Sequence, residues 1–159
     1  MKMIFLISII FVSSLSFAGC VKKMNDKPII IAHRGASGYL PEHTLECKAM
    51  AFGMNPDYIE QDVVLTKDNH PVVIHDHYLD TVSDVDRVFP GRKRSDGRYY
   101  VIDFTLEEIR KLRLRERIDL KTGNCVYPKR FPGETIIDFK IPTLEEEIQL
   151  IQGDRKSVV

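Results

Sequence analysis

The chain has 159 residues, of which 43% are hydrophobic and 29% are charged. These proportions are ordinary for a globular domain and exclude a disordered or fibrous protein. Lys and Arg together number 23, as do Asp and Glu, so the formal net charge is zero. Because there is no overall basic field, we expect no nucleic-acid partner, and any anionic substrate must be held by a local group of residues.

The first residues have the pattern of an export signal. Lys2 precedes an uninterrupted run of apolar and small polar residues over 3–17, and small residues then lead to Cys20. This run is short for a membrane-spanning helix and typical of a cleaved signal. Residues 17–20 resemble a bacterial lipobox, so we expect Cys20 to become a lipidated N-terminus. The alternative is a plain signal peptide cut near Ala18, which would leave Cys20 as an ordinary thiol.

The expected organisation is a signal peptide over residues 1–19, a lipidated N-terminus and tether over 20–27, and a globular domain from residue 28. The mature protein would be exported and anchored by its lipid to a bacterial membrane, in the periplasm or at the cell surface. Such a compartment would permit a disulfide between Cys47 and Cys125, and two separate, buried thiols are the alternative. No Cys-x-x-Cys or Cys/His zinc spacing is present.

The domain begins with a predicted βαβ unit. The apolar run at residues 29–32 is typical of a strand buried on both faces. A helix is then predicted from Pro41 to Gly53, where proline favours the first turn and glycine ends the pattern. A second strand is predicted over residues 58–66. Strand, helix and strand in this order indicate a parallel sheet.

A hairpin is predicted next, because turn residues at 67–70 separate the second strand from the apolar run at 72–74. No crossover helix fits between them, so these strands should be antiparallel. Folding about that turn places His75 opposite Asp62, and cross-strand partners share a face. Glu60 lies on the same face because side chains alternate with a period of two.

Residues 84–130 are charged and rich in turn residues, which predicts an insertion. Its basic residues at 92–94 have the pattern of a solvated loop more than of a binding patch. One helix is predicted from Thr105 to about Arg115, with a capping box formed by Thr105 and Glu108. A last helix is predicted from a capping threonine at residue 143 to about residue 152.

Candidate catalytic residues follow the first strand. His33 and Arg34 come at its carboxyl end, where parallel α/β folds build their active sites. The planar donors of Arg34 match phosphate oxygens, and its charge persists at every working pH. His33 and His75 could transfer protons, since imidazole titrates near neutral pH.

Two carboxylates, Glu60 and Asp62, interrupt the apolar second strand. An unpaired buried carboxylate costs several kcal/mol, so these groups need a partner. They could hold a hard divalent cation such as Ca²⁺ or Mg²⁺. The alternative is a salt-bridge network with Arg34 and Lys67.

These motifs together resemble the glycerophosphodiester phosphodiesterase family. The resemblance is carried by His-Arg-Gly at 33–35, Glu-Gln-Asp at 60–62 and His-Asp at 75–76, with further matches at 96–105 and 143–147. It extends from about residue 28 to residue 153. The chain is most similar to the exported bacterial branch, which carries an insertion after the hairpin.

The resemblance implies a TIM-type (β/α) barrel of the phosphodiesterase superfamily, which we expect to be truncated here to its first half, over residues 28–159. His33 and His75 would be the general acid and base, and Arg34 would bind the substrate phosphate. Glu60 and Asp62 would hold a divalent cation, with Ca²⁺ expected first and Mg²⁺ second. The resemblance also implies a third acidic ligand on a further strand, which we expect to be absent from these residues.

The implied function is metal-dependent hydrolysis of small glycerophosphodiesters to glycerol 3-phosphate and an alcohol. One alternative is a catalytically inactive, truncated surface lipoprotein that acts as a binding protein. Another is a related phosphodiesterase that uses the same barrel to act on phospholipids. Both histidines and both carboxylates are retained, and a pure binding protein would not need them, so the sequence favours the enzyme.

Overall fold

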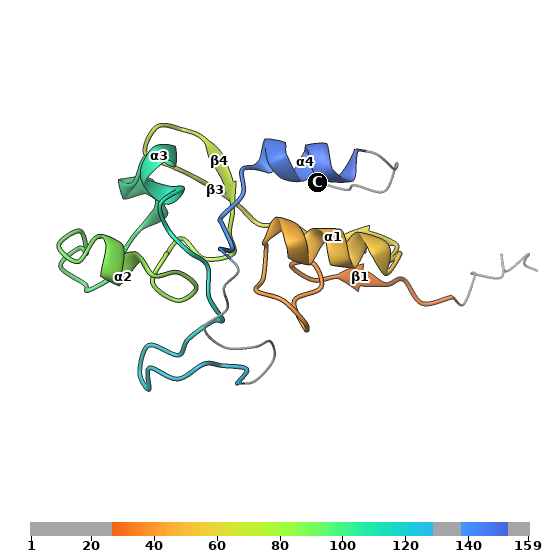
Figure 1. Ribbon diagram of the computed structural model, residues 1–159, viewed down its shortest axis with the longest axis horizontal. Helices are drawn as coiled ribbons and strands as arrows, with labels where there is room; N and C mark the ends of the chain where they lie inside the picture. Colours follow the sequence, from red (N-terminus) through yellow and green to blue (C-terminus); the bar gives the residue numbers. More distant parts are fainter. Residues whose placement is uncertain (1–26, 129–137, 153–159) are drawn as a thin grey trace, which may run out of the picture.

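A computed structural model of the chain describes residues 27–128 and 138–152 (Figure 1). The predicted signal peptide and Cys20 lie outside the described residues. Within the described part, no helix is long and apolar enough to cross a membrane.

The predicted βαβ unit is present. Strand β1 (Ile31–Ala32) pairs in parallel with β2 (Tyr58–Ile59), and helix α1 (Leu45–Gly53) connects them. Ile30, just before β1, and Ile31, within it, are 57% and 58% exposed, so the prediction that the run at 29–32 is buried on both faces is wrong for the described residues. The cause is that β1 pairs with β2 alone among the strands of residues 27–128 and 138–152.

Helix α1 begins at Leu45, later than the predicted start at Pro41. His43 has a φ of 61°, a left-handed conformation that cannot belong to a right-handed helix. Thr44 is then the N-cap, and its Oγ1 accepts a hydrogen bond from the Cys47 amide at 3.1 Å. A left-handed residue directly before the cap therefore sets the start of α1.

The second predicted strand is divided into β2 and β3 (Val63–Leu65), with Glu60 and Asp62 in the connecting stretch. Strand β3 forms the predicted antiparallel hairpin with β4 (Pro71–Val73). Val63 pairs with Val73 and Leu65 with Pro71, which differs by one residue from the predicted register.

The register differs because the loop spans residues 66–70, one residue more than the predicted turn. The Thr66 amide donates to the His70 carbonyl at 3.0 Å, and Asn69 adopts a φ of 62°. The Ile74 amide donates to the Asp62 carbonyl at 3.0 Å. The predicted pairing of Asp62 with His75 is therefore wrong, because a one-residue shift moves every side chain to the other face.

Residues 84–128 contain α2 (Val85–Val88), the 3₁₀ helix η1 (Val101–Asp103) and α3 (Leu106–Ile109). The predicted capping box of Thr105 and Glu108 is confirmed. Helix α3 is shorter than predicted, since the chain after it bonds elsewhere: the Leu114 amide donates to the carbonyl of residue 139 at 2.8 Å.

This segment has a hydrophobic core in common with the hairpin, which lies between it and α1 (Figure 1). Outside this core, the guanidinium groups of Arg92 and Arg94 are partly exposed and pair with Glu108 and Asp103. The fully buried core members include Val72, Leu79, Val85, Val101, Phe104, Ile109 and Leu112.

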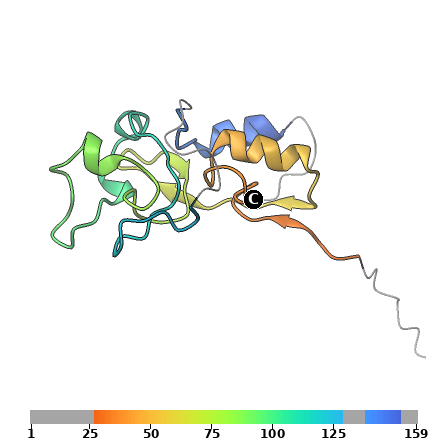
Figure 2. The same cartoon turned by 60° about the horizontal axis from the view of Figure 1, so that its bottom comes forward.

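Helix α4 (Leu144–Ile151) lies beside α1, as both views show (Figures 1 and 2). Thr143 caps α4 as predicted. A smaller core beneath α1 includes Cys47, which is buried, whereas Cys125 is exposed. The two cysteines are not joined by a disulfide, so the structure has separate thiols, and the expectation that both are buried is wrong for Cys125.

Candidate active site

The site begins at the sharp turn after β1. Arg34 and Gly35 have φ values of 59° and 87°, and Gly35 lies so close to Cys47 that an added Cβ would be 2.9 Å from its Sγ. Glycine is therefore required at this position. The turn lets the Arg34 amide donate to Glu60 Oε2 at 2.7 Å, which ties the end of β1 to the stretch after β2.

The guanidinium of Arg34, predicted to bind phosphate, is held by Glu42. Its Nη1 donates to the two carboxylate oxygens at 3.1 and 3.2 Å. His33, immediately before it, is exposed, and its carbonyl accepts a hydrogen bond from the Ser37 hydroxyl at 2.8 Å. Glu42 thus fixes the position of the Arg34 guanidinium, while the backbone amide of Arg34 is bound to Glu60.

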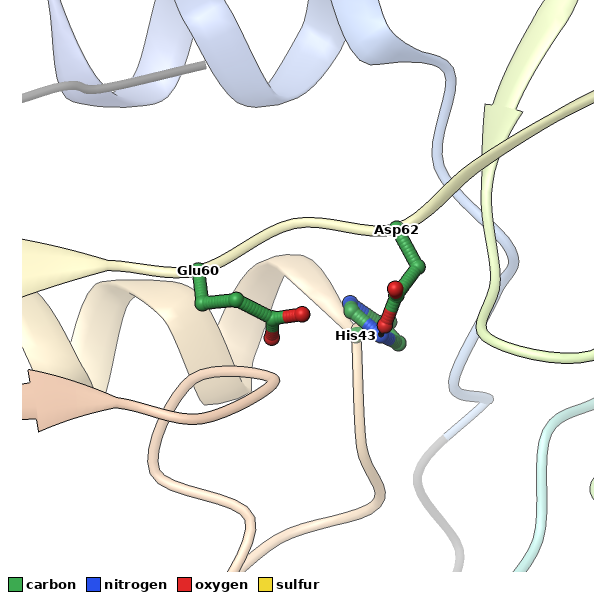
Figure 3. Close-up of side chains that lie close together, drawn as sticks. All are labelled: His43, Glu60 and Asp62. Carbon is green, nitrogen blue, oxygen red and sulfur yellow. Dashed lines mark hydrogen bonds and ion pairs between the residues drawn. The ribbon is translucent and has the colours of Figure 1, made fainter.

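Glu60 and Asp62 converge with a third residue, His43, which was not predicted from the sequence (Figure 3). The carboxylates come from the stretch between β2 and β3, and His43 from the turn before α1. One potential ligand atom from each lies within 4.8 Å of the others. Both carboxylates are half-buried, while His43 is 1% exposed.

His43 acts on Asp62 as a neutral donor. Burial and the nearby charge of Lys48 outweigh the attraction of Asp62 and lower the pKa of His43 to about 4. Its Nε2 lies 3.0 Å from Asp62 Oδ2, and a carboxylate can only accept, so Nε2 carries the proton and donates it. The buried Nδ1 has no hydrogen-bond partner among the described residues and is the unprotonated nitrogen. His43 therefore orients one Asp62 oxygen.

The donor set fits a hard divalent cation. Glu60 and Asp62 offer carboxylate oxygens, which Ca²⁺ and Mg²⁺ prefer. Among the residues described, neither carboxylate forms an ion pair with Arg34 or Lys67, so the alternative of a salt-bridge network is wrong. Lys48 contributes differently, because its Nζ donates to the backbone carbonyl of Glu60.

His75 lies after β4, outside the cluster of Glu60, Asp62 and His43. Its Nδ1 lies 2.6 Å from Asp76 Oδ1. Partial burial works to raise the pKa of Asp76, but hydrogen bonds from Arg117 and His75 and the charge of Arg117 outweigh it and lower the pKa to about 2. Asp76 is therefore an anion, and it accepts a hydrogen bond from His75 Nδ1–H.

The structure thus brings Arg34, Glu60 and Asp62 together and adds His43. It joins neither His33 nor His75 to the carboxylates by a hydrogen bond within the described part of the chain. His43 falls within the segment of family resemblance, but no spacing or pattern indicates its role. His43 and Asp62 are 19 positions apart in the sequence, and the fold brings them into contact.

Relatives of known family match most of this chain. The sequence model of the Glycerophosphoryl diester phosphodiesterase family matches residues 33–158. A glycerophosphodiester phosphodiesterase of Haemophilus influenzae is 58% identical over 137 residues, which cover 85% of this chain and 37% of the relative. One of Treponema pallidum is 45% identical over 139 residues, covering 86% and 39%. The chain thus spans less than half the length of these relatives.

Solved structures agree with the expected barrel class. A protein from Silicibacter pomeroyi, described as a glycerophosphoryl diester phosphodiesterase, has a TM-score of 0.61 and 33% identity, over 79% of this chain and 40% of that one. An Oleispira antarctica phosphodiesterase, solved with the product sn-glycerol-3-phosphate, has a TM-score of 0.55 and 29% identity over the same shares. The described fold is thus part of a TIM-type barrel, and the chain belongs to the glycerophosphoryl diester phosphodiesterase family.

Proposed function

We propose that this protein is a metal-dependent phosphodiesterase that hydrolyses glycerophosphodiesters to glycerol 3-phosphate and an alcohol. The observation that carries the proposal is the bond of 2.7 Å from the Arg34 amide to Glu60. It joins the residue that would bind phosphate to a carboxylate that would bind metal, at one edge of the βαβ unit. The product named for the Oleispira relative supports the same product class.

Glu60 and Asp62 would hold the cation, with Ca²⁺ the first expectation and Mg²⁺ the second. When bound there, such an ion supplies positive charge against the phosphoryl oxygens, where negative charge builds up during the reaction. Arg34 would add a second positive charge with bidentate geometry. The hydrogen bond from His43 would keep one Asp62 oxygen in place before the ion arrives.

His33 and His75 would transfer the protons. One imidazole takes a proton from the nucleophile, which is water or the substrate's own hydroxyl, as the new bond to phosphorus forms. The other gives a proton to the alcohol oxygen as its bond to phosphorus breaks. If the nucleophile is the substrate's hydroxyl, this step forms a cyclic phosphodiester, and water then opens that ring to glycerol 3-phosphate in a second step of the same kind. In His75 the bond from Nδ1 to Asp76 leaves Nε2 as the nitrogen that can exchange protons.

The test is release of glycerol 3-phosphate from glycerophosphocholine, with Ca²⁺ and then with a chelator. Activity should appear with Ca²⁺ and be lost on chelation. His33→Ala and His75→Ala should each lose most of the turnover, with a modest change in KM. His70→Ala is the matched control, because His70 is an exposed loop residue paired with Asp68. Full turnover in either of the first two variants would refute the acid–base assignment.

A chimera tests the same residues in a longer chain. Residues 28–152 would replace the aligned segment of the Haemophilus relative, which is 58% identical. The chimera should hydrolyse glycerophosphocholine, and its turnover should depend on His33 and His75 as above. A folded chimera without activity would contradict the proposal. It would favour the alternative, in which this segment belongs to a surface protein that binds without catalysis.

We further propose export and anchoring through lipidated Cys20. The support is the lipobox-like sequence at residues 17–20. Metabolic labelling with a radioactive fatty acid in a bacterial host should label the protein, and Cys20→Ser should abolish the label. Equal labelling of Cys20→Ser and the unchanged chain would disprove the anchor, and Cys125→Ser is the control.

A further inference from the structure

One arginine from the segment after α3 connects two carboxylates of the candidate site. Arg117 Nη2 donates to Glu42 Oε1 at 2.7 Å, and its Nε donates to Glu42 Oε2 at 3.2 Å. Its Nη1 donates to Asp76 Oδ2 at 2.6 Å. Glu42 is the carboxylate that holds Arg34, and Asp76 the one that holds His75. Arg117 therefore lies between a predicted phosphate-binding residue and a predicted proton-transfer residue.

The backbone around Arg117 is fixed on both sides. The Arg115 amide donates to the Val82 carbonyl at 2.8 Å, and the Ile118 amide donates to the Thr81 carbonyl at 2.9 Å. The carbonyl of Arg117 itself accepts from the Val126 amide at 2.8 Å. The guanidinium, whose side chain is 17% exposed, thus extends from an anchored strand-like stretch.

The charges of this group agree with its geometry. Burial works to raise the pKa of Glu42, but the hydrogen bond and charge of Arg117, with the charge of Arg34, lower it. Burial works to lower the pKa of Arg117, but Glu42 and Asp76 raise it. Both carboxylates therefore remain anions, and Asp76 accepts a hydrogen bond from His75 Nδ1–H.

We infer that Arg117 is a positioning residue, which holds Asp76 in the orientation that fixes the Nδ1–H tautomer of His75. The inference rests on the proposed function, because it assigns Arg117 to the proposed proton-transfer step. Arginine suits this position, since its rigid fork reaches two carboxylates at once and the single ammonium of lysine does not. Thr81 Oγ1 also donates to Asp76 Oδ2, at 2.9 Å, so the experiment must separate Arg117 from Thr81.

The test is the tautomer of neutral His75, measured from its two side-chain ¹⁵N chemical shifts in the full chain at pH 8. The unchanged chain should show Nδ1–H as the dominant form. Arg117→Met should lose this dominance and move both shifts towards those of a mixed population, because the freed Asp76 can turn away. Arg113→Met is the matched control, since Arg113 is 60% exposed and pairs with Asp138. Thr81→Val should leave Nδ1–H dominant.

If Arg117→Met does not fold, Arg117→Lys provides the test, because lysine keeps the positive charge. It should also weaken the Nδ1–H form, to a smaller extent. If whichever of these variants folds keeps the shifts of the unchanged chain, or if Thr81→Val alone removes the Nδ1–H form, the inference is wrong. The readout needs no substrate, so it stands apart from the activity test. Failure of the phosphodiesterase assay would leave this tautomer result intact.

Discussion

His43 illustrates how a single residue gains a role through folding. Its left-handed backbone places the imidazole beside Asp62, where the Nε2 proton orients a carboxylate that would bind metal. Removing a residue that hydrogen-bonds to a metal ligand typically weakens metal binding by about 10- to 100-fold. We therefore expect His43→Ala to weaken Ca²⁺ binding by about that factor, measured by calorimetric titration of the folded chain.

Two further variants make this prediction specific. His43→Asn should recover part of the affinity, because asparagine tolerates positive φ and keeps an N–H donor. His70→Ala, an exposed control, should bind Ca²⁺ as the unchanged chain does. Unaltered affinity in His43→Ala would show that Asp62 needs no support from His43.

Asp76 should make the free energy of unfolding depend on pH in acid. Its pKa is lowered to about 2, from an ordinary value near 3.8 in the unfolded chain. The stabilisation is therefore fully present above about pH 4 and is lost as pH falls through 2. It amounts to about 2 kcal/mol. In urea unfolding at pH 2 to 5, Asp76→Asn should lose this part of the pH dependence and be less stable at pH 5.

The control for this prediction is Asp86→Asn. Asp86 also pairs with an arginine, but its side chain is 58% exposed. Its substitution should leave the pH dependence of stability nearly unchanged, because exposed ion pairs contribute little. If Asp76→Asn and the unchanged chain lose stability in parallel between pH 5 and 2, the low pKa is incorrect.

Part of the site could be predicted from sequence and part could not. Glu60 and Asp62 stood out because carboxylates within an apolar strand need a partner, and Arg34 because it ends a strand. Arg117 did not stand out, since its partner Glu42 is 75 positions away and both are ordinary surface residue types. Local patterns detect an unusual residue in its own segment. They do not detect a contact made by distant segments.

At the level of elements, strand and helix types were predictable but their boundaries depended on backbone conformations that residue type specifies weakly. The capping threonines, Thr105 and Thr143, were correctly predicted because capping is a local hydrogen bond. The register of the hairpin was missed because Asn69 adopts a left-handed conformation and lengthens the loop by one residue. Asparagine tolerates this conformation without requiring it, so the sequence left two loop lengths open.

The contact of α1 with α4 contains a buried ion pair. Lys48 Nζ lies 3.5 Å from Glu147 Oε2, and both side chains are 0% exposed. Burial outweighs the attraction of Lys48 and raises the pKa of Glu147 to about 7. Removing one member of a buried pair leaves an uncompensated charge, at a cost of about 3–5 kcal/mol. We expect Glu147→Leu to destabilise by about that amount, and Lys48→Met with Glu147→Leu to recover most of it.

A double-mutant cycle by urea unfolding at pH 8 measures this coupling. The matched control is the exposed pair of Lys111 and Glu107, four residues apart, whose side chains are 55% and 85% exposed. Its coupling should be about 0.3–0.5 kcal/mol. If the two cycles give similar energies, the pair between α1 and α4 contributes no more than a surface pair.

At the scale of the whole molecule, the parallel βαβ unit followed from periodicity, whereas the barrel class followed from family motifs. The described residues form two separate sheets of two strands each. Strands of this number and arrangement do not by themselves indicate a barrel. Residues 84–130 were predicted to be a charged insertion, yet the apolar residues of the described part, 84–128, supply much of the larger core. Charge dominated its composition, while Val85, Val101 and Phe104 determined its packing.

Metal binding should be measurable as an increase in the free energy of unfolding of the whole chain. An ion that binds the folded state alone, at 100 times its Kd, raises the free energy of unfolding by about 2.7 kcal/mol. Thermal unfolding of the full chain should therefore shift upwards by several degrees with Ca²⁺ and return with chelator. The double variant Glu60→Gln with Asp62→Asn should remove the shift. The control, Glu107→Gln with Asp86→Asn, removes two exposed carboxylates and should keep the shift. A shift that survives the first pair would locate the ion elsewhere. It would leave Arg34 and the histidines without the metal that the proposed hydrolysis requires.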